Sequence, residues 1–102
     1  MEDLTQEEWV ELLENDNNAV ILDVRTGDEV FQGKIPNSIH IDFYKGQAFI
    51  EELETLDKSK NYYVYCRSGN RSGQACKMMK QLGFQNAYNL IGGMLQWDGD
   101  VE

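Results

Sequence analysis

Cysteine, proline and histidine are scarce in this 102-residue chain, which contains two cysteines, one proline and one histidine. Two cysteines in a chain without an export signal do not predict a disulfide framework, so both are expected to be free thiols. The single histidine, His40, has no cluster of cysteines or acids at ligand spacing near it. The sequence therefore predicts no metal site and no cofactor.

Long apolar runs are also absent. No stretch approaches the roughly 20 apolar residues of a membrane span. The first residues, MEDLTQEEW, have neither the basic start nor the apolar run of a signal peptide. We therefore expect a cytoplasmic protein with no membrane partner. The length is typical of one domain with its own core, so residues 1–102 are expected to form a single domain.

Acidic residues are missing between Lys58 and Trp97, although the whole chain has 18 of them and a formal charge of −9. The basic residues of this segment are Lys58, Lys60, Arg67, Arg71, Lys77 and Lys80. An acidic protein repels polyanions, which argues against a nucleic-acid partner, whereas a locally positive segment can attract a small anion. The alternative for the four lysines, that they only form a solvated surface, remains open.

The first third of the chain alternates between helix and strand signals. Thr5 can cap a helix with Glu8 reaching back to it, and residues 15–18 end that helix in turn-forming residues. Residues 2–4 are expected to form a short edge strand, and residues 19–22 form a buried strand that ends in Asp23. The predicted inward face of the helix consists of Trp9, Leu12 and Leu13.

The middle and the end of the chain continue the alternation. After a turn at residues 33–37, residues 38–43 alternate as a strand with Ile39, Ile41 and Phe43 on one face. A helix is expected near residues 47–56, a last strand at residues 87–90, and a short final helix held by Trp97. The elements predict a three-layer α/β domain with about five mainly parallel strands, whose order remains open.

The most informative stretch runs from Tyr62 to Leu82. Residues 62–65 are aromatic or β-branched without alternation, which is typical of a strand buried on both faces of a parallel sheet. A small polar loop from Cys66 to Ser72 follows. The helix after it has apolar side chains at three- and four-residue spacing: Ala75, Cys76, Met79 and Leu82. Backbone N–H groups of such a loop, together with the helix start, can hold an anion near Cys66.

The loop CRSGNRS resembles the active-site loop of the rhodanese family, in which a nucleophilic cysteine opens a six-residue cradle, here Cys66 to Arg71. Two further segments resemble family signatures in the same order: LDVRTGDEVFQGKIPNSIHI and the closing GGMLQW. The chain departs from the family pattern at Lys34, Asn37 and Ser38, where the family usually has His, Gly and Ala. None of these departures lies in the cysteine loop.

The resemblance implies a rhodanese-like α/β/α domain and a sulfurtransferase with Cys66 as the nucleophile. Two guanidinium groups and the helix start should lower the pKa of Cys66, so that its thiolate attacks the outer sulfur of thiosulfate or of a persulfide donor. The persulfide then passes its sulfur to a thiol, to cyanide or to an acceptor protein. The residues expected to bind the donor are Arg67, Ser68, Gly69, Asn70, Arg71 and Ser72.

Four residues outside the loop need separate interpretation. Asp23 either fixes one of the loop arginines, as the resemblance implies, or only caps a turn. Arg25 is expected to support the site or, more simply, to pair with Glu29 four residues later. His40 is interpreted as a structural polar group rather than a base. Cys76 is interpreted as a core residue rather than a resolving thiol.

Two other functions must be weighed against sulfur transfer. Cysteine-dependent phosphatases and arsenate reductases also place a cysteine before an anion-binding loop, but five residues separate their cysteine from the arginine. Here only four residues separate Cys66 from Arg71, and the shorter loop suits a single sulfur better than a phosphate. The other alternative is a sulfur carrier or binding module for one protein partner, and the sequence leaves it open.

Overall fold

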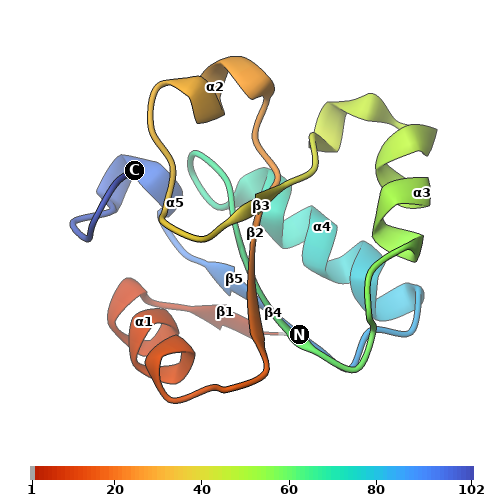
Figure 1. Ribbon diagram of the computed structural model, residues 1–102, viewed down its shortest axis with the longest axis horizontal. Coiled ribbons are helices and arrows are strands. Elements are labelled where there is room, and N and C mark those ends of the chain that lie inside the picture. Colours follow the sequence, from red (N-terminus) through yellow and green to blue (C-terminus); the bar gives the residue numbers. More distant parts are fainter. Residues whose placement is uncertain (1) are drawn as a thin grey trace.

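The computed structural model describes residues 2–102, which form a parallel sheet with helices on both faces (Figure 1). The five strands are β1 (Glu2–Leu4), β2 (Ala19–Asp23), β3 (Ile39–His40), β4 (Asn61–Tyr65) and β5 (Asn86–Leu90). Their order across the sheet is β1-β5-β4-β2-β3, and every pairing is parallel. The predicted α/β class is confirmed, and the strand order that the sequence left open is now defined.

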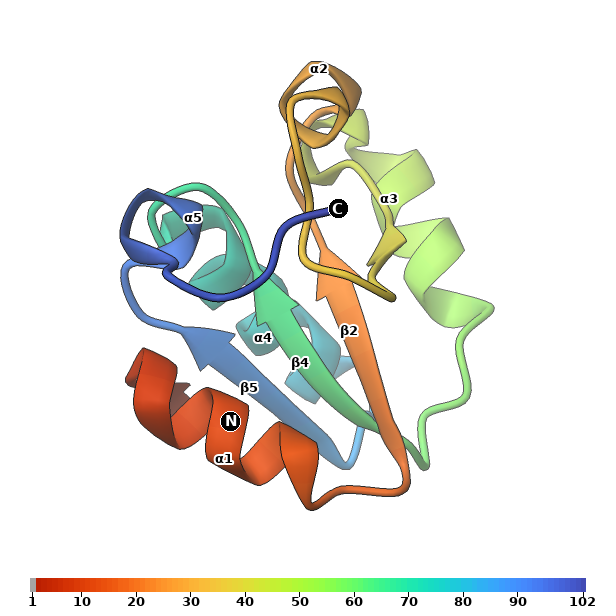
Figure 2. The ribbon, with the colours of Figure 1, turned by 60° about the vertical axis from the view of Figure 1, so that its left-hand side comes forward.

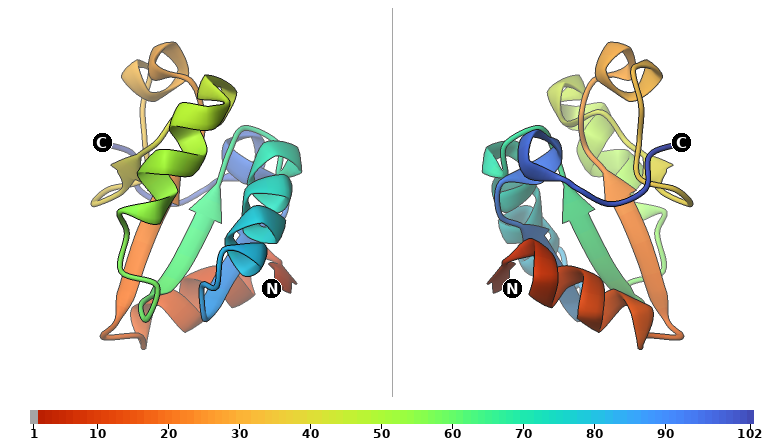
Figure 3. Two further views of the ribbon diagram at one scale, coloured as in Figure 1. Left: turned by 90° about the vertical axis from the view of Figure 1, so that its right-hand side faces the viewer. Right: turned by 90° about the vertical axis from the view of Figure 1, so that its left-hand side faces the viewer.

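The helices divide between the two faces and the carboxyl end of the sheet. They are α1 (Gln6–Glu14), α2 (Gly27–Phe31), α3 (Gln47–Glu54), α4 (Asn70–Gln81), α5 (Gly93–Gln96) and a 3₁₀ helix, η1 (Phe43–Lys45). Helix α1 covers one face, and α3 and α4 cover the other (Figure 2). Helices α2 and α5 lie beyond the carboxyl end of the sheet (Figure 3).

Strand β4 is central and buried on both faces, as its unbroken run of aromatic and β-branched residues predicts. Tyr62 and Val64 pack into the cluster under α3 and α4, whereas Tyr63 and Tyr65 pack against Trp9 of α1. The Trp9 ring meets Tyr63 edge to face, with ring centroids 5.8 Å apart. These stacked layers hold the end of β4, and therefore Cys66, in a rigid position.

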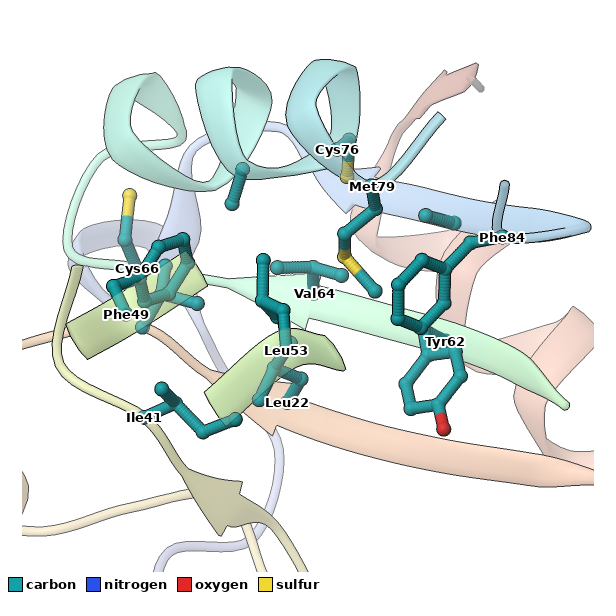
Figure 4. Close-up of a cluster of buried hydrophobic side chains, with 13 residues drawn as sticks. Leu22, Ile41, Phe49, Leu53, Tyr62, Val64, Cys66, Cys76, Met79 and Phe84 are labelled. Atoms are coloured by element: carbon teal, nitrogen blue, oxygen red, sulfur yellow. The ribbon is translucent and has the colours of Figure 1, made fainter. Parts of the chain in front are cut away.

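The larger core cluster lies between the sheet and helices α3 and α4 (Figure 4). Phe49 and Leu53 from α3 and Met79 from α4 are almost completely buried there, each contributing about 1.5 to 3 kcal/mol of apolar burial. Cys76 is also buried in this cluster, which agrees with its interpretation as a core residue. Figure 4 shows its sulfur well apart from that of Cys66.

Two predicted features of the fold are wrong in detail. Only Ile39 and His40 of the predicted strand 38–43 form a strand, because the Asp42 side chain accepts a hydrogen bond from the Tyr44 N–H and starts a 3₁₀ turn. Leu12 is 42% exposed rather than buried, because α1 turns Trp9 toward the core and Val10 and Leu13 pack beside it.

The predicted cap of the first helix is confirmed: the Thr5 hydroxyl accepts from the Glu8 N–H, and the Glu8 carboxylate accepts from the Thr5 N–H. The same arrangement recurs at α2, where Thr26 and Glu29 form the capping pair. Glu29 is therefore held at the start of a short helix, next to the cysteine loop. Among residues 2–102, no helix combines the length and the apolar character that a membrane crossing requires.

Candidate active site

Cys66 lies directly after β4 and exposes no surface. Its Sγ accepts hydrogen bonds from the Gly69 N–H at 3.1 Å, the Ser72 N–H at 3.4 Å and the Ser72 hydroxyl at 3.3 Å. The loop can curl around the sulfur because Gly69 adopts a left-handed conformation, with φ +100°, immediately before α4 begins. The loop therefore forms a cradle of donors that converge on one sulfur atom.

These donors decide the ionisation of the cysteine. Burial opposes the charged form, but hydrogen bonds from the Ser72 hydroxyl and from the backbone N–H groups of Ser72, Gly69 and Ser68 outweigh it. The net effect lowers the pKa of Cys66 below its ordinary value. In contrast, burial raises the pKa of Cys76 to about 12, so the second thiol stays protonated and inert.

The Gly92-Gly93 pair lets the start of α5 pack against the cysteine loop. The N–H groups of Met94 and Leu95 at the start of α5 donate to the carbonyl oxygens of Cys66 and Arg67, each at 3.0 Å. A Cβ at Gly93 would collide with the same two carbonyl groups. Glycine at this position lets α5 approach the loop closely enough to hold it in place.

Arg71, at the start of α4, is engaged by a carboxylate from α2. Its guanidinium forms two hydrogen bonds with Glu29 and lies over the Tyr44 ring, 5.3 Å from the centroid. The Arg71 bonds, with smaller contributions from the Thr26 cap, hold the pKa of Glu29 at about 2 against the effect of burial. Glu29 in turn raises the pKa of Arg71 above its ordinary value, despite the opposing effect of burial.

Arg67 differs from Arg71 because its side chain is exposed. Among residues 2–102, no carboxylate forms an ion pair with it. It lines a cavity of about 340 Å³ together with Arg25, Gln32 and Leu95. A second cavity, of about 280 Å³, is lined by Ser68, Asn70 and Lys77. Residues of the cysteine loop thus line two cavities, and Arg67 is the loop cation that faces solvent.

Asp23 and Arg25 form a buried pair beside the loop. The Arg25 Nη2 lies 2.7 Å from the Asp23 carboxylate, and the same carboxylate accepts from the Tyr65 hydroxyl at 2.7 Å. Arg25 also donates to the carbonyl oxygens of Glu29 and Gly33. The pair therefore joins β2, β4 and the chain after α2.

For Asp23 and Arg25 alike, one of the two predicted alternatives is wrong, whereas the turn-capping alternative for Asp23 is confirmed. Asp23 does not hold a loop arginine; it bonds Arg25 and also caps a turn by accepting from the Arg25 N–H at 3.0 Å. Arg25 does not pair with the Glu29 carboxylate, because that carboxylate faces Arg71 on the neighbouring element. His40 lies at the sheet edge, 2.6 Å from the Arg25 carbonyl oxygen, which agrees with a structural polar group.

Sequence reasoning missed Glu29 as the partner of Arg71, and it did not identify Tyr44, Tyr65 or Asn89 as residues of the site. Asn89 accepts a hydrogen bond from the Ser72 hydroxyl and donates to the Gly69 carbonyl oxygen. A polar residue among the apolar and aromatic residues of the predicted strand 87–90 was the only available signal for it. No signal in the sequence pairs Glu29 with a residue 42 positions later.

The parallel sheet, and the buried cysteine held in a loop between a strand and a helix, define this protein as an α/β domain with a cysteine-centred site. The sequence model of the rhodanese-like domain matches residues 5–100, and the chain belongs to that family. A candidate sulfurtransferase of Bacillus subtilis, YtwF, is 40% identical over 92 residues, which cover 90% of this chain and 85% of that protein.

Two further relatives agree with this assignment. A rhodanese-like domain protein from Staphylococcus aureus has a crystal structure with a TM-score of 0.85 and 31% identity, covering 100% of this chain and 97% of that one. A candidate sulfur carrier protein of Bacillus subtilis, YrkF, is 32% identical over 98% of this chain but only 52% of its own length. The two curated relatives are thus named as a sulfurtransferase and a sulfur carrier.

Proposed function

We propose that this protein moves a sulfane sulfur from thiosulfate or a persulfide donor to a thiophilic acceptor through a persulfide on Cys66. The observation that carries the proposal is the convergence of three hydrogen-bond donors on the Cys66 sulfur. Such a cradle stabilises a sulfur anion, and a thiolate with a lowered pKa is the form that attacks sulfur.

The reaction proceeds in two balanced steps. The Cys66 thiolate attacks the outer sulfur of thiosulfate, a new S–S bond forms, and the S–S bond of thiosulfate breaks so that its electron pair leaves with sulfite. An acceptor such as cyanide or a thiolate then attacks the outer sulfur of the persulfide. The cysteine S–S bond breaks, and the Cys66 thiolate returns with its charge. This covalent relay gives ping-pong kinetics.

The loop residues have different roles in this scheme. Arg67 faces solvent and attracts the anionic donor and the leaving sulfite. Arg71 is held by Glu29, so its charge acts on the sulfur from a fixed position. The N–H groups of Ser68, Gly69 and Ser72 stabilise the sulfur anion. Because Cys66 exposes no surface, the donor reaches it only when side chains of the surrounding loop move.

The test is sulfur loading measured by intact mass. Incubation with thiosulfate, without reductant, should add one sulfur atom, and cyanide should remove it. Cys66→Ser should abolish the addition, and Cys76→Ser should leave it intact, because Cys76 is buried in the core. Loading that persists in Cys66→Ser would exclude Cys66 as the nucleophile, and equal loss in both variants would mean that the thiols act as a pair.

A sulfur carrier for one protein partner is the second candidate, and the name of the YrkF relative favours it. In this version Cys66 still forms a persulfide, but small donors are poor substrates. Recovery of an acceptor protein in a pull-down with the Cys66 persulfide, together with negligible turnover of thiosulfate and cyanide, would support it. Rapid turnover with thiosulfate would instead support the enzyme.

A further inference from the structure

The Ser72 hydroxyl lies between two hydrogen-bond acceptors. Its oxygen is 3.3 Å from Cys66 Sγ and makes a short contact with the Oδ1 atom of Asn89. A hydroxyl carries one hydrogen, so Ser72 can donate to only one of these acceptors at a time. The two acceptors therefore compete for a single proton next to the sulfur.

The orientation of the Asn89 amide is determined by its other contacts. Its Nδ2 lies 2.9 Å from the Asp3 carboxylate and 3.1 Å from the Gly69 carbonyl oxygen, and both of these groups can only accept. The amide nitrogen must face them, so the amide oxygen must face Ser72. Asp3 and Asn89 are also direct partners in the register of β1 and β5.

The contact between Ser72 and Asn89 is enclosed. Ser72 exposes no surface, Asn89 is 5% exposed, and a Cβ at Gly73 would lie only 3.3 Å from the Asn89 amide nitrogen. Glycine at position 73 thus leaves room for the amide against α4. A buried acceptor that loses its donor costs free energy.

We propose that Asn89 is a positioning residue that holds the Ser72 hydroxyl hydrogen while Cys66 is a thiol and loses it when Cys66 becomes a thiolate. In the thiol state, the Cys66 S–H donates to Ser72, and Ser72 donates to Asn89. In the thiolate state, Ser72 turns its hydrogen to the sulfur. The Asn89 oxygen then faces only the lone pairs of the Ser72 hydroxyl oxygen. Asn89 therefore opposes the ionisation that Ser72 favours, and Asp3 keeps Asn89 in that orientation.

Other charged and titratable groups surround Cys66, and the test must hold them constant. From α4, Arg71 lies near the sulfur and is paired with Glu29 of α2. Cys76 also lies on α4 but stays protonated. Arg67 lies in the loop itself, and the Asp3 carboxylate of β1 lies behind Asn89. None of these groups except Asp3 contacts the Ser72 and Asn89 pair through a hydrogen bond among residues 2–102.

This inference rests on the proposed role of Cys66, but its test needs no sulfur donor. We would measure the rate of alkylation by iodoacetamide against pH in a Cys76→Ala background, where Cys66 is the only thiol. Asn89→Leu keeps the size of the side chain and removes the competing oxygen. At pH values below the midpoint of the wild-type curve of rate against pH, alkylation should become about two- to tenfold faster, which corresponds to the free energy of one hydrogen bond. The midpoint of this curve should also move to lower pH.

A double-mutant cycle separates this role from a purely structural one. In a Ser72→Ala background there is no hydroxyl to share, so Asn89→Leu should no longer shift the midpoint. The bond that Asn89 donates to the Gly69 carbonyl is lost in both backgrounds, so its effect cancels. A midpoint shift of the same size in both backgrounds would overturn the proposal.

Exchanging Asp3 and Asn89 provides a second variant, whose result does not depend on whether the Asn89→Leu variant folds. Asp3→Asn combined with Asn89→Asp preserves an amide-to-carboxylate contact between β1 and β5 but points a carboxylate at Ser72. The midpoint should then move to higher pH, opposite to Asn89→Leu. A lower or unchanged midpoint in the exchanged variant would also overturn the proposal. Sulfur loading is measured separately, so failure of sulfur transfer with intact alkylation shifts would count only against the proposed function.

Discussion

Glu29 and Arg71 lie 42 residues apart in the sequence and form a two-pronged ion pair, with Nη1–Oε1 at 2.7 Å and Nη2–Oε2 at 2.9 Å. The pair joins the start of α2 to the start of α4, the helix that begins within the cysteine loop. Its partial burial makes it stronger than an ordinary surface pair. The pair therefore holds Arg71 in place, whereas Arg67, the other arginine of the loop, is exposed to solvent.

This pair should make stability depend on pH in the acid range. The pKa of Glu29 is about 2 in the folded chain and 4.5 ordinarily, so the unfolded chain binds more protons between these values. The contribution is complete above about pH 5 and is lost as the pH falls toward 2. Glu29→Gln should cost about 1 to 3 kcal/mol at neutral pH and almost nothing near pH 2. Urea unfolding of both proteins across this range would measure the difference, and a constant difference would contradict the assignment.

Removing the charge of Arg67 should slow sulfur loading without affecting folding. Arg67→Gln loses a charged contact to the donor, worth roughly 1.5 to 3 kcal/mol, so the loading rate should fall about ten- to a hundredfold. Lys77→Gln makes the same change of charge at the second cavity and serves as the control. Rapid mixing with thiosulfate followed by mass measurement gives the rates. Equal slowing in both variants would show that only overall charge matters.

Asp23→Asn should destabilise the whole domain. The change leaves the buried Arg25 guanidinium without its counter-charge, and breaking such a pair typically costs about 3 to 5 kcal/mol. Tyr65→Phe removes only one hydrogen bond to the same carboxylate and should cost about 1 to 3 kcal/mol. Denaturant unfolding of the two variants should therefore rank Asp23→Asn as the more damaging. The reverse order would mean that the carboxylate serves mainly Tyr65.

Gly93→Ala should displace the cysteine loop and abolish most sulfur loading. Its Cβ would collide with the carbonyl groups of Cys66 and Arg67, which hold the loop against α5. Gly83→Ala is the matched control, because Gly83 also has a positive φ, at +95°, but no atom lies within 4 Å of its added Cβ. Both variants should lose stability through backbone strain, and only Gly93→Ala should lose loading as well. Normal loading by folded Gly93→Ala would refute the role of this contact.

The two thiols should differ sharply in reactivity. Cys66 has a lowered pKa, whereas burial raises the pKa of Cys76 to about 12. A maleimide reagent at neutral pH should label one thiol in the native protein, and the second only after denaturant is added. Peptide mapping would show which cysteine carries the label. Rapid native labelling of Cys76 would contradict its place in the core.

Local sequence patterns predicted the features that depend on near neighbours. The β4 run, the cap at Thr5 and the apolar side of α4 each follow from a few consecutive residues, because backbone geometry and burial decide them locally. The motif around Cys66 indicated the family, and it singled out the proposed nucleophile together with the residues that surround it. The donors that surround the sulfur come from the six residues after it.

Only the tertiary structure decided which partners the site residues take. The spacing of four predicted a pair between Arg25 and Glu29, but the tertiary structure places the Glu29 carboxylate against Arg71, and Arg25 pairs with Asp23, two residues before it. Asn89 reaches Ser72 because β5 lies beside β4, an adjacency that the chain order does not determine. Sequence by itself thus determined most of the elements and singled out Cys66 as the proposed nucleophile. The tertiary structure determined the long-range contacts around it, Glu29 with Arg71 and Ser72 with Asn89, because these residues are distant in the chain.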